Sequence, residues 1–288
     1  WSSDVCSSDL IARNAAGTLP KLFEALDAQT FPHDRMEIIL VDGCSEDETR
    51  QLMQEYAARN DFVRTEVLEN PGRTLPCGWN VALKAAKGDA VLRVDAHAFF
   101  PPEFVALNAA ALEKGEDICG GKVISLPANK TPWSVTLNEA ENSMFGGSFA
   151  AFRRADTPRY VSTAAFAIYR REIFDEVGPY NEKLVRTEDN EMHYRMKKAG
   201  YRFWYDPAIV SWRETRGTLG KLMKQKYLNG YWIGRTLGVE PRCFSLYHFV
   251  PFLFVLALCG TAVLALCGIT WPAAALWIAY GAAALGMS

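Results

Sequence analysis

The sequence has 288 residues and a formal net charge of −2 at pH 7. Its seven cysteines are odd in number and form no Cys-x-x-Cys pair, which excludes a disulfide framework and a structural zinc site. Its four histidines are too scattered to indicate a His-based metal cluster. The length fits one large α/β domain of roughly 200 to 240 residues with an appendage.

Charge is unevenly distributed toward the C-terminus. Between Lys197 and Arg242 there are ten lysines and arginines against three acidic residues, whereas residues 243–288 contain no charged side chain. A basic block directly before an uncharged stretch is unlike a diffuse nucleic-acid surface, so we expect no nucleic acid as a partner. The uncharged 46 residues are long enough for two membrane crossings of roughly 20 residues each.

We expect these crossings near His248–Gly268 and Pro272–Ser288. The basic residues before the first crossing predict that the preceding domain faces the cytoplasm. The second crossing stops at Ser288, so we expect the chain to be a fragment. The alternative is a buried helical hairpin of a soluble protein.

The first ten residues, Trp-Ser-Ser-Asp-Val-Cys-Ser-Ser-Asp-Leu, show neither a strand nor a helix period. They also lack the basic start and apolar core of a signal peptide. They resemble a translated adapter sequence, and we interpret residues 1–10 as foreign. A first buried strand is expected at this position, so the sequence predicts that this strand is missing or overwritten.

From residue 11 to residue 125, predicted strands and helices alternate. Each strand is a short apolar run bounded by turn residues, and each helix shows apolar residues on one face. The strands are expected at Glu37–Val41, Val63–Leu68, Ala90–Val94 and Ile118–Val123, and the helices after Thr18, around Leu52–Tyr56, at Trp79–Lys87 and at Pro102–Lys114. This alternation predicts an α/β fold with a doubly wound, mostly parallel sheet.

After Ser125 the pattern loosens into a predicted variable loop region that faces a second substrate. Order returns with a strand within Tyr160–Tyr169, a helix from Arg170 to Val177, a helix opened by residues 187–191, and two short strands at Arg202–Tyr205 and Ile209–Trp212. Residues 218–237 form a basic amphipathic pattern, which is typical of a helix in the membrane interface. Packing of that helix on the globular domain explains the pattern equally well. We therefore expect a catalytic domain at 11–215, an interface helix within 216–242 and membrane helices at 243–288.

Acidic residues follow directly on two of the predicted strands. Asp42 follows one, and Asp95, with His97 two residues later, follows another. Ligands of open α/β sheets bind beyond the carboxyl ends of the strands, so both carboxylates are expected to face one crevice. The sequence lacks both glycine-rich phosphate-binding patterns, which favours a divalent metal that bridges carboxylate and phosphate. Capping by Asp95 and a structural role for His97 are the alternatives.

Asp189 lies in the first turn of a predicted helix. Acidic residues there complement the helix dipole, and only the rest of the site makes Asp189 a candidate base. Arg73 and Arg93 are expected to add positive charge to the crevice.

Several motifs occur together in a specific order and spacing. They are Asp42-Gly-x-Ser-x-Asp47-x-Thr, Asn70-Pro71-Gly-Arg73 with Gly78-x-Asn80, Gly88-Asp-x-x-x-Arg93-x-Asp95-x-His97, Tyr169-Arg170-Arg171-Glu-x-Phe174 and Glu188-Asp189-x-Glu191-x-x-Tyr194-Arg195. In this the chain resembles glycosyltransferase family 2. The resemblance is to membrane-anchored bacterial enzymes of exopolysaccharide synthesis, of the succinoglycan glucosyltransferase type.

The resemblance implies a GT-A-like fold, a nucleotide-diphosphate sugar donor, Mg²⁺ or Mn²⁺, and inversion at the anomeric carbon. It also implies a lipid-linked saccharide as acceptor and a place in the bacterial inner membrane. By position, Asp42, Arg73 and Asp95 would bind the donor, Asp95 and His97 the metal, and Asp189 would be the general base. His97 departs from the family, because it replaces the second acid of the more familiar Asp-x-Asp.

Two other functions remain open at this point. One is a polyprenyl-phosphate hexosyltransferase, whose acceptor is the lipid phosphate itself. The other is a non-catalytic membrane scaffold with the same fold. A processive polysaccharide synthase is disfavoured, because the Gln-x-x-Arg-Trp motif of such enzymes is absent and Gln225 is followed by Lys-Tyr-Leu228.

Overall fold

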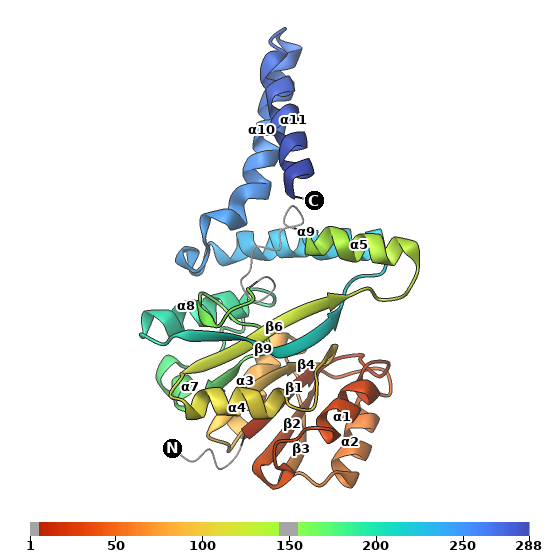
Figure 1. The fold of residues 1–288 in the computed structure, drawn as a ribbon, viewed down its shortest axis with the longest axis vertical. Helices are drawn as coiled ribbons and strands as arrows, with labels where there is room; N and C mark the ends of the chain where they lie inside the picture. The colour runs from red at the N-terminus through yellow and green to blue at the C-terminus, as the bar shows by residue number, and fades with distance from the viewer. Residues whose placement is uncertain (1–5, 144–154, 288) are drawn as a thin grey trace.

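The computed structural model describes residues 6–143 and 155–287. Within them, nine strands form one sheet in the order β3-β2-β1-β4-β8-β6-β9-β5, and β7 pairs with β9 (Figure 1). The strands are β1 (Cys6–Ala12), β2 (Met36–Asp42), β3 (Arg64–Glu69), β4 (Ala90–Asp95), β5 (Ala98–Phe99), β6 (Ile118–Leu126), β7 (Arg159–Val161), β8 (Ile168–Arg170) and β9 (Phe203–Glu214).

Helices connect these strands and extend the chain beyond them. The α-helices are α1 (Leu19–Asp27), α2 (Thr49–Arg59), α3 (Leu75–Ala85), α4 (Phe104–Glu113), α5 (Pro132–Asn142), α7 (Glu172–Val177), α8 (Glu188–Lys198), α9 (Leu219–Thr236), α10 (Val250–Leu266) and α11 (Trp271–Met287). Three short 3-10 turns are η1 (His33–Arg35), η2 (Pro241–Cys243) and η3 (Leu246–Phe249) in the described part of the chain.

The first half of the sheet is parallel, as the sequence predicts. β1 lies between β2 and β4, and β3 pairs with β2, all in parallel register. The second half is mixed, because β8 runs antiparallel to both β4 and β6, while β6 and β9 are parallel. The predicted pair of strands at 202–212 is one long strand, β9. The sheet is therefore less uniformly parallel than expected, since β8 enters it from the loop region and not from a crossover helix.

The prediction that the first strand is missing is wrong for the described residues. Residues 6–12 form β1, and every one of its seven residues is buried. β2 and β4 would otherwise leave a row of unpaired backbone groups at the middle of the sheet. Strand pairing uses backbone hydrogen bonds, so residues 6–12 can form the strand between β2 and β4 although their sequence shows no apolar alternation. Residues 1–5 lie outside the described residues, and the foreign origin of the segment stays a prediction.

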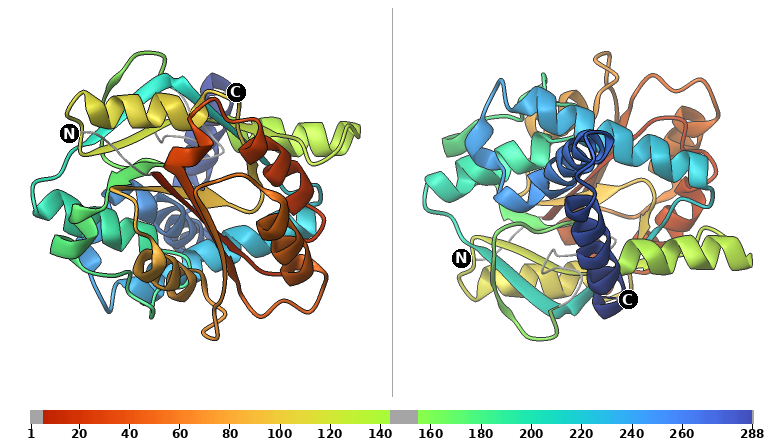
Figure 2. Two further views of the ribbon diagram at one scale, coloured as in Figure 1. Left: turned by 90° about the horizontal axis from the view of Figure 1, so that it is seen from below. Right: turned by 90° about the horizontal axis from the view of Figure 1, so that it is seen from above.

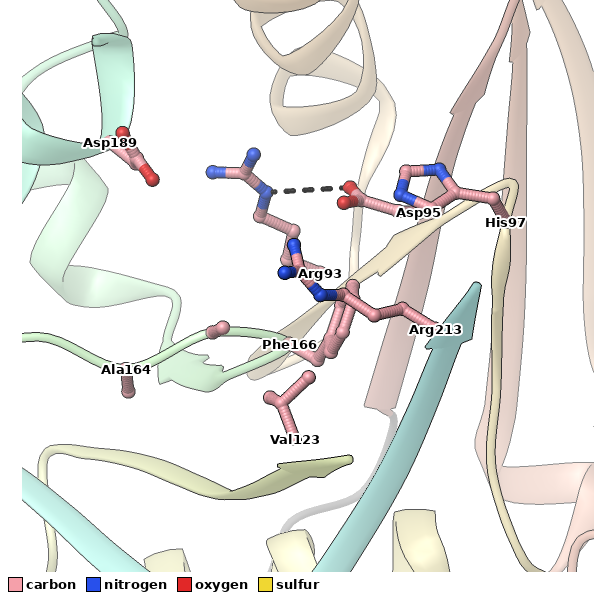
Figure 3. Close-up of a pocket in the computed structure, with 9 residues that line it drawn as sticks. Arg93, Asp95, His97, Val123, Ala164, Phe166, Asp189 and Arg213 are labelled. Atoms are coloured by element: carbon pink, nitrogen blue, oxygen red, sulfur yellow. Dashed lines mark ion pairs between the residues drawn. The ribbon is translucent and has the colours of Figure 1, made fainter. Parts of the chain in front are cut away.

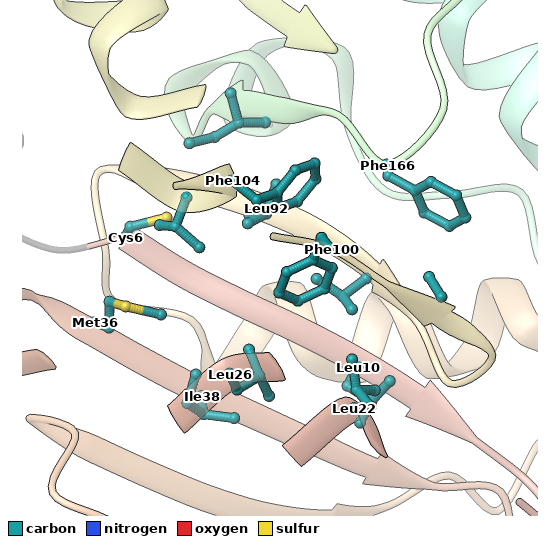
Figure 4. Packing of buried hydrophobic residues seen from close by; sticks show 14 of the residues in the cluster. Cys6, Leu10, Leu22, Leu26, Met36, Ile38, Leu92, Phe100, Phe104 and Phe166 are labelled. Carbon is teal, nitrogen blue, oxygen red and sulfur yellow. The ribbon is translucent and has the colours of Figure 1, made fainter. Parts of the chain in front are cut away.

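Both faces of the sheet are covered by helices, and each face has its own core (Figure 2). Successive strand residues point to opposite faces, so Leu10 belongs to one cluster and Ile11 to the other. Figure 4 shows the first cluster, in which Leu22 and Leu26 of α1 lie against the strands. The second cluster contains Trp79 of α3 together with residues of α7 and α8. Burial on both faces explains why the strands read as continuous apolar runs.

The C-terminal part extends away from the sheet. α9 lies across one end of the domain, and α10 and α11 form a hairpin that projects from it (Figure 1). Among the described residues, one helix is long and apolar enough to cross a membrane, the 21 residues Leu246–Leu266 with a mean hydropathy of 2.5 and no burial. α11 has 17 residues, or about 25 Å of helix, which is short of a ~30 Å hydrocarbon core. The second crossing stays a prediction.

The predicted variable loop region contains regular structure. It contains α5, whose N-cap Thr131 accepts a hydrogen bond from the backbone N–H of Ser134. Residues 144–154 of this region lie outside the described residues. The interface helix predicted at 218–237 is α9, two residues shorter in total.

Candidate active site

A cavity of about 220 Å³ lies at the carboxyl end of β4 (Figure 3). Its lining brings together four of the residues that the sequence analysis selected, Arg93, Asp95, His97 and Asp189. Asp95 is the last residue of β4, His97 lies in the turn to β5, and Asp189 lies in the first turn of α8. The remaining lining residues are Val123, Ala164, Ala165, Phe166 and Arg213.

The carboxylates of Asp95 and Asp189 face each other across this cavity, with the guanidinium of Arg93 between them (Figure 3). Arg93 Nε is 3.9 Å from Asp95 Oδ1, and Arg93 Nη2 is 3.3 Å from Glu188 Oε1. The guanidinium also lies 4.6 Å from the centroid of the Trp79 ring. Arg93 is therefore a partly buried cation that links β4, α3 and α8. The sequence predicted its positive charge in this crevice but not these contacts.

Glu188 and Asp189 are adjacent in sequence but lie in different surroundings. Glu188 is buried, and its Oε2 has no hydrogen-bond partner. Burial raises the pKa of Glu188 well above its ordinary value, the charge of Asp189 raises it further, and Arg93 opposes both. Asp189 faces the cavity, and its Oδ1 accepts a 2.8 Å hydrogen bond from the backbone N–H of Asn190. Of the two carboxyls, Asp189 is the one placed to meet a ligand.

The buried His193 belongs to the support of α8. Its Nδ1 lies 2.8 Å from Thr163 Oγ1, and its Nε2 lies 2.9 Å from the hydroxyl of Tyr169. Burial lowers the pKa of His193 to about 3, and the charges of Arg93 and Lys197 act in the same direction. The ring is therefore neutral at physiological pH and has a structural role.

A second cavity of about 480 Å³ lies over the carboxyl end of β1 and shares Asp95 and His97 with the first. The rest of its lining is Ile11, Ala12, Arg13, Asn14, Ala15, Gly17, Thr18, Leu75, Ala96 and Arg216. Three arginines that the sequence analysis did not select, Arg13, Arg213 and Arg216, line the two cavities. No local pattern distinguishes them, because they come from the β1–α1 loop and the end of β9.

Asp42 and Arg73 line neither of these two cavities. Asp42 is 1% exposed, and each of its carboxylate oxygens lies 3.2 Å from the backbone N–H of Ser45, which donates to them. The expectation that Asp42 and Asp95 face one crevice therefore stays a prediction, since Asp95 lines both cavities and Asp42 lines neither. β1 separates β2 from β4, so the two strand ends are roughly 10 Å apart. Arg73 is exposed in the turn before α3, with φ at 56°.

Asp42 nevertheless contacts the wall of the second cavity through one intermediate. Ser45, which it holds, accepts a 2.9 Å hydrogen bond at Oγ from the backbone N–H of Asn14. Asn14 lines the second cavity and itself has a positive φ of 51°. Asp42 thus supports the loop that forms this wall.

The site contains few side chains that could bind a metal ion. No cluster of three or more His, Cys, Asp or Glu side chains with metal-binding geometry occurs in residues 6–143 or 155–287. Asp95 and His97 supply one carboxylate and one imidazole beside the same two cavities. This set fits a hard cation that takes few protein ligands and completes its shell with phosphate oxygens and water.

Comparison with known proteins decides the family. A sequence model described as "Glycosyl transferase family 2" matches residues 10–178, which is more than half of the chain. The chain belongs to glycosyltransferase family 2. The matched range runs from the last three residues of β1 to the end of α7, contains Asp95 and His97, and ends before Asp189.

Two curated relatives illustrate this membership. The succinoglycan biosynthesis protein ExoA of Rhizobium meliloti is 29% identical over 226 residues, which are 77% of this chain and 66% of that protein. The dolichyl N-acetyl-α-D-glucosaminyl phosphate 3-β-D-2,3-diacetamido-2,3-dideoxy-β-D-glucuronosyltransferase of Methanococcus voltae is 24% identical, over 83% of this chain and 75% of that protein. The match thus spans about two thirds to three quarters of the length of these family members.

Solved structures confirm the GT-A-like fold. The mannosyltransferase PcManGT from Pyrobaculum calidifontis, in complex with GDP-Man and Mn²⁺, has a TM-score of 0.66 at 17% identity and covers 96% of this chain and 80% of its own. Residues 1–349 of Staphylococcus aureus TarS in complex with UDP-GlcNAc have a TM-score of 0.58 at 21% identity and cover 81% of this chain and 66% of their own.

Proposed function

We propose that this family 2 chain is a membrane-anchored, metal-dependent, inverting glycosyltransferase. It transfers a sugar from a nucleotide-diphosphate donor to a lipid-linked saccharide in exopolysaccharide synthesis. The observation that carries the proposal is the placement of Asp95 and Asp189 on opposite sides of one cavity. One carboxylate thereby meets the leaving diphosphate and the other meets the incoming hydroxyl.

The donor would occupy the second cavity and reach into the first. About 480 Å³ is within the usual range for a ligand pocket, and the shared lining of Asp95 and His97 joins the two spaces. Asp42 would serve the nucleoside by fixing the Ser45–Asn14 contact at the cavity wall. Arg13 and Arg216 add positive charge beside the expected diphosphate, and Arg73 would approach it from the turn before α3.

A divalent cation, Mg²⁺ or Mn²⁺, would be held by Asp95 and His97. When bound, it would absorb negative charge that develops on the leaving diphosphate. Binding of a nucleotide sugar and Mn²⁺ by the structurally similar mannosyltransferase supports this assignment.

The chain's own contribution to the displacement is a base. The acceptor oxygen forms its bond to the anomeric carbon as the bond to the diphosphate breaks, and the hydroxyl proton passes to the Asp189 carboxylate. A sugar hydroxyl is a weak nucleophile, and a positioned base contributes typically about 10²- to 10⁴-fold. A single displacement from the face opposite the leaving group inverts the anomeric carbon.

The outer surface of α9 supports a lipid-linked acceptor. Leu219, Met223, Tyr227 and Tyr231 recur every four residues and are all exposed, which makes one apolar stripe along the helix. Lys226 borders one edge of this stripe, and Lys224 borders the other. An apolar stripe with basic edges is typical of a helix that lies in a membrane interface, where a lipid-linked substrate is found.

The decisive experiment changes Asp189 to Asn. This change keeps the shape and most of the capping ability, so a purely structural role predicts nearly normal turnover. A base role predicts that transfer falls about 10²- to 10⁴-fold while donor affinity survives. UDP-glucose, UDP-N-acetylglucosamine and GDP-mannose are titrated calorimetrically with Mn²⁺, and transfer into a bacterial lipid extract is measured on the same preparation.

Asp95→Ala is the matched control, because it lies across the same cavity but belongs to the donor side. Its donor affinity should fall at least about tenfold, whereas that of Asp189→Asn should not. Near-normal transfer by Asp189→Asn would remove the base assignment. Donor binding that persists unchanged in excess chelator would remove the cation.

A further inference from the structure

The segment that carries the proposed base is tied to α9 by a buried hydrogen bond. Thr187 is the N-cap of α8 and directly precedes Glu188 and Asp189. Its Oγ1 lies 2.5 Å from Oγ1 of Thr236, at the end of α9. Thr187 is 3% exposed and Thr236 is fully buried. A side chain of the interface helix thus contacts the residue two positions before Asp189.

The direction of this bond follows from the other partner of Thr236. Thr236 Oγ1 donates its single proton to the backbone oxygen of Trp232 at 2.7 Å. Its lone pairs remain, so it accepts the proton of the Thr187 hydroxyl. Because both hydroxyls are buried, removing that of Thr236 leaves the Thr187 hydroxyl without this partner.

A second contact joins the same two segments. Arg186 Nη1 donates to Asn229 Oδ1 of α9 at 3.4 Å, seven residues before Thr236 and so two helical turns away. The turn η2, which follows α9, also packs against α8. In Figure 1, α9 lies above α8. The start of α8 is therefore held along α9 at more than one point.

The opposite side of this segment is held by the sheet. Glu188 pairs with Arg93 of β4, as described above. Among the described residues, the side-chain hydrogen bonds of Asp189 itself are only the local ones with Asn190. Its place in the cavity is therefore set by its two predecessors, one fixed by α9 and one fixed by β4.

We propose that Thr236 and Thr187 are positioning residues for Asp189. This inference rests on the proposed function, since it assumes that Asp189 is the base. Through these residues α9, the helix with the exposed apolar stripe, sets the position of the carboxylate. A shift of α9 against the domain would then move the Asp189 carboxylate and change the rate of transfer.

The test replaces Thr236 by Val, which keeps the volume and removes the hydroxyl. Thr236→Ser retains the hydroxyl and is the conservative variant. Thr65→Val is the matched control, because Thr65 on β3 loses one hydroxyl contact, 2.8 Å to Asn60 Oδ1, far from α8. All variants are measured as full chains, with the donor panel and lipid extract used for Asp189→Asn.

A base displaced by about 1 Å loses up to about 100-fold in rate. We therefore expect Thr236→Val to lower kcat within that range per folded molecule while donor affinity stays at the wild-type value. Thr236→Ser should restore kcat, and Thr65→Val should leave it unchanged. The double variant Thr187→Val/Thr236→Val should be no worse than either single variant, because both remove the same bond. Hydrogen exchange in α8 should be faster in Thr236→Val than in Thr236→Ser.

Two results separate this inference from the proposed function. If Thr236→Val has wild-type kcat while Asp189→Asn is impaired, the positioning role is wrong and the base stands. If Asp189→Asn transfers sugar at the wild-type rate, Asp189 is not the base, and both the proposed mechanism and this inference are wrong. Should Thr236→Val not fold, Thr236→Ala, which leaves space instead of filling it, is measured against Thr236→Ser with the same criteria.

Discussion

At the scale of single residues, Asp9 in the middle of β1 is a buried acid with one oxygen that lacks a hydrogen-bond partner. Its side chain is fully buried, Oδ1 accepts a 2.6 Å hydrogen bond from Ser7, and Oδ2 has no partner. Glu37 on the adjacent β2 shows what a satisfied buried acid looks like. It accepts from the backbone N–H groups of Lys87 and Gly88 and pairs with Arg64. A buried polar group without partners is destabilising, so Asp9 conflicts with its place in the fold.

This conflict predicts a dependence of stability on pH. Burial raises the pKa of Asp9 from 3.8 to about 7, the hydrogen bond from Ser7 opposes the rise, and the charge of Glu37 adds to it. Between these values the folded chain holds a proton that the unfolded chain has lost. The stability that the protonated Asp9 gives the folded chain is therefore fully present below pH 3.8 and is lost as the pH rises to about 7. The free energy of unfolding changes by about 4 kcal/mol over this range.

We expect Asp9→Val to remove this dependence. The free energy of unfolding should rise relative to the parent, and the gain should be larger at pH 8 than at pH 4. Thermal or denaturant unfolding across this range measures it, with the exposed Asp34→Asn as the control. An equal gain at both pH values would contradict a buried, proton-holding Asp9. A stabilising Val would also support the proposal that residues 1–10 are foreign to this fold.

At the scale of elements, the helices differ in how tightly they pack. α9 carries three glycines, and a Cβ added at Gly230 or Gly234 would meet nothing within 4 Å. In α3, a Cβ at Gly78 would lie 2.6 Å from Ile11 Cγ2. α3 is thus in close contact with β1, whereas the outer face of α9 is free of protein contacts at these positions.

This difference predicts opposite effects of the same substitution. Gly230→Ala should stabilise α9 by about 0.5–1 kcal/mol, because glycine weakens a helix interior and no clash opposes the methyl group. Gly78→Ala gains the same propensity but loses about 1–3 kcal/mol to overpacking, so its net effect is destabilising. The two variants are compared by their midpoints of unfolding, measured in the same detergent. A destabilising Gly230→Ala would mean that another surface covers this face of α9.

At the scale of the whole molecule, the hairpin of α10 and α11 leads to a prediction about where the protein resides. The span Leu246–Leu266 is unburied and uncharged, and α9 lies across its base (Figure 1). Apolar insertion is not screened by ions, unlike electrostatic attachment. We expect the protein to sediment with membranes, to resist extraction by high salt and to be released by detergent.

A variant with reduced positive charge on α9 provides the control for this prediction. Replacing Lys221, Lys224 and Lys226 together by Gln removes much of the basic charge of α9 and leaves the hairpin intact. The variant should sediment as the parent does, since the hairpin dominates binding. Release of the parent by salt alone would show that the hairpin does not span a membrane.

The sequence by itself determined β2, β3 and β4 of the parallel half of the sheet, the strand ends that carry Asp42 and Asp95, and the membership in family 2. It also indicated α9 and the apolar hairpin. These features depend on local patterns, namely apolar period, turn residues and motif spacing, which a single stretch of chain contains in full.

Only the tertiary structure decided the rest. It placed residues 6–12 between β2 and β4, because the unpaired backbone of two distant strands requires a third. It separated Asp42 from Asp95 by the width of β1, and it brought Arg93 between Asp95 and Glu188. It also joined Thr187 to Thr236 across 49 positions. Such contacts depend on how whole elements pack together, and no spacing within one segment encodes them.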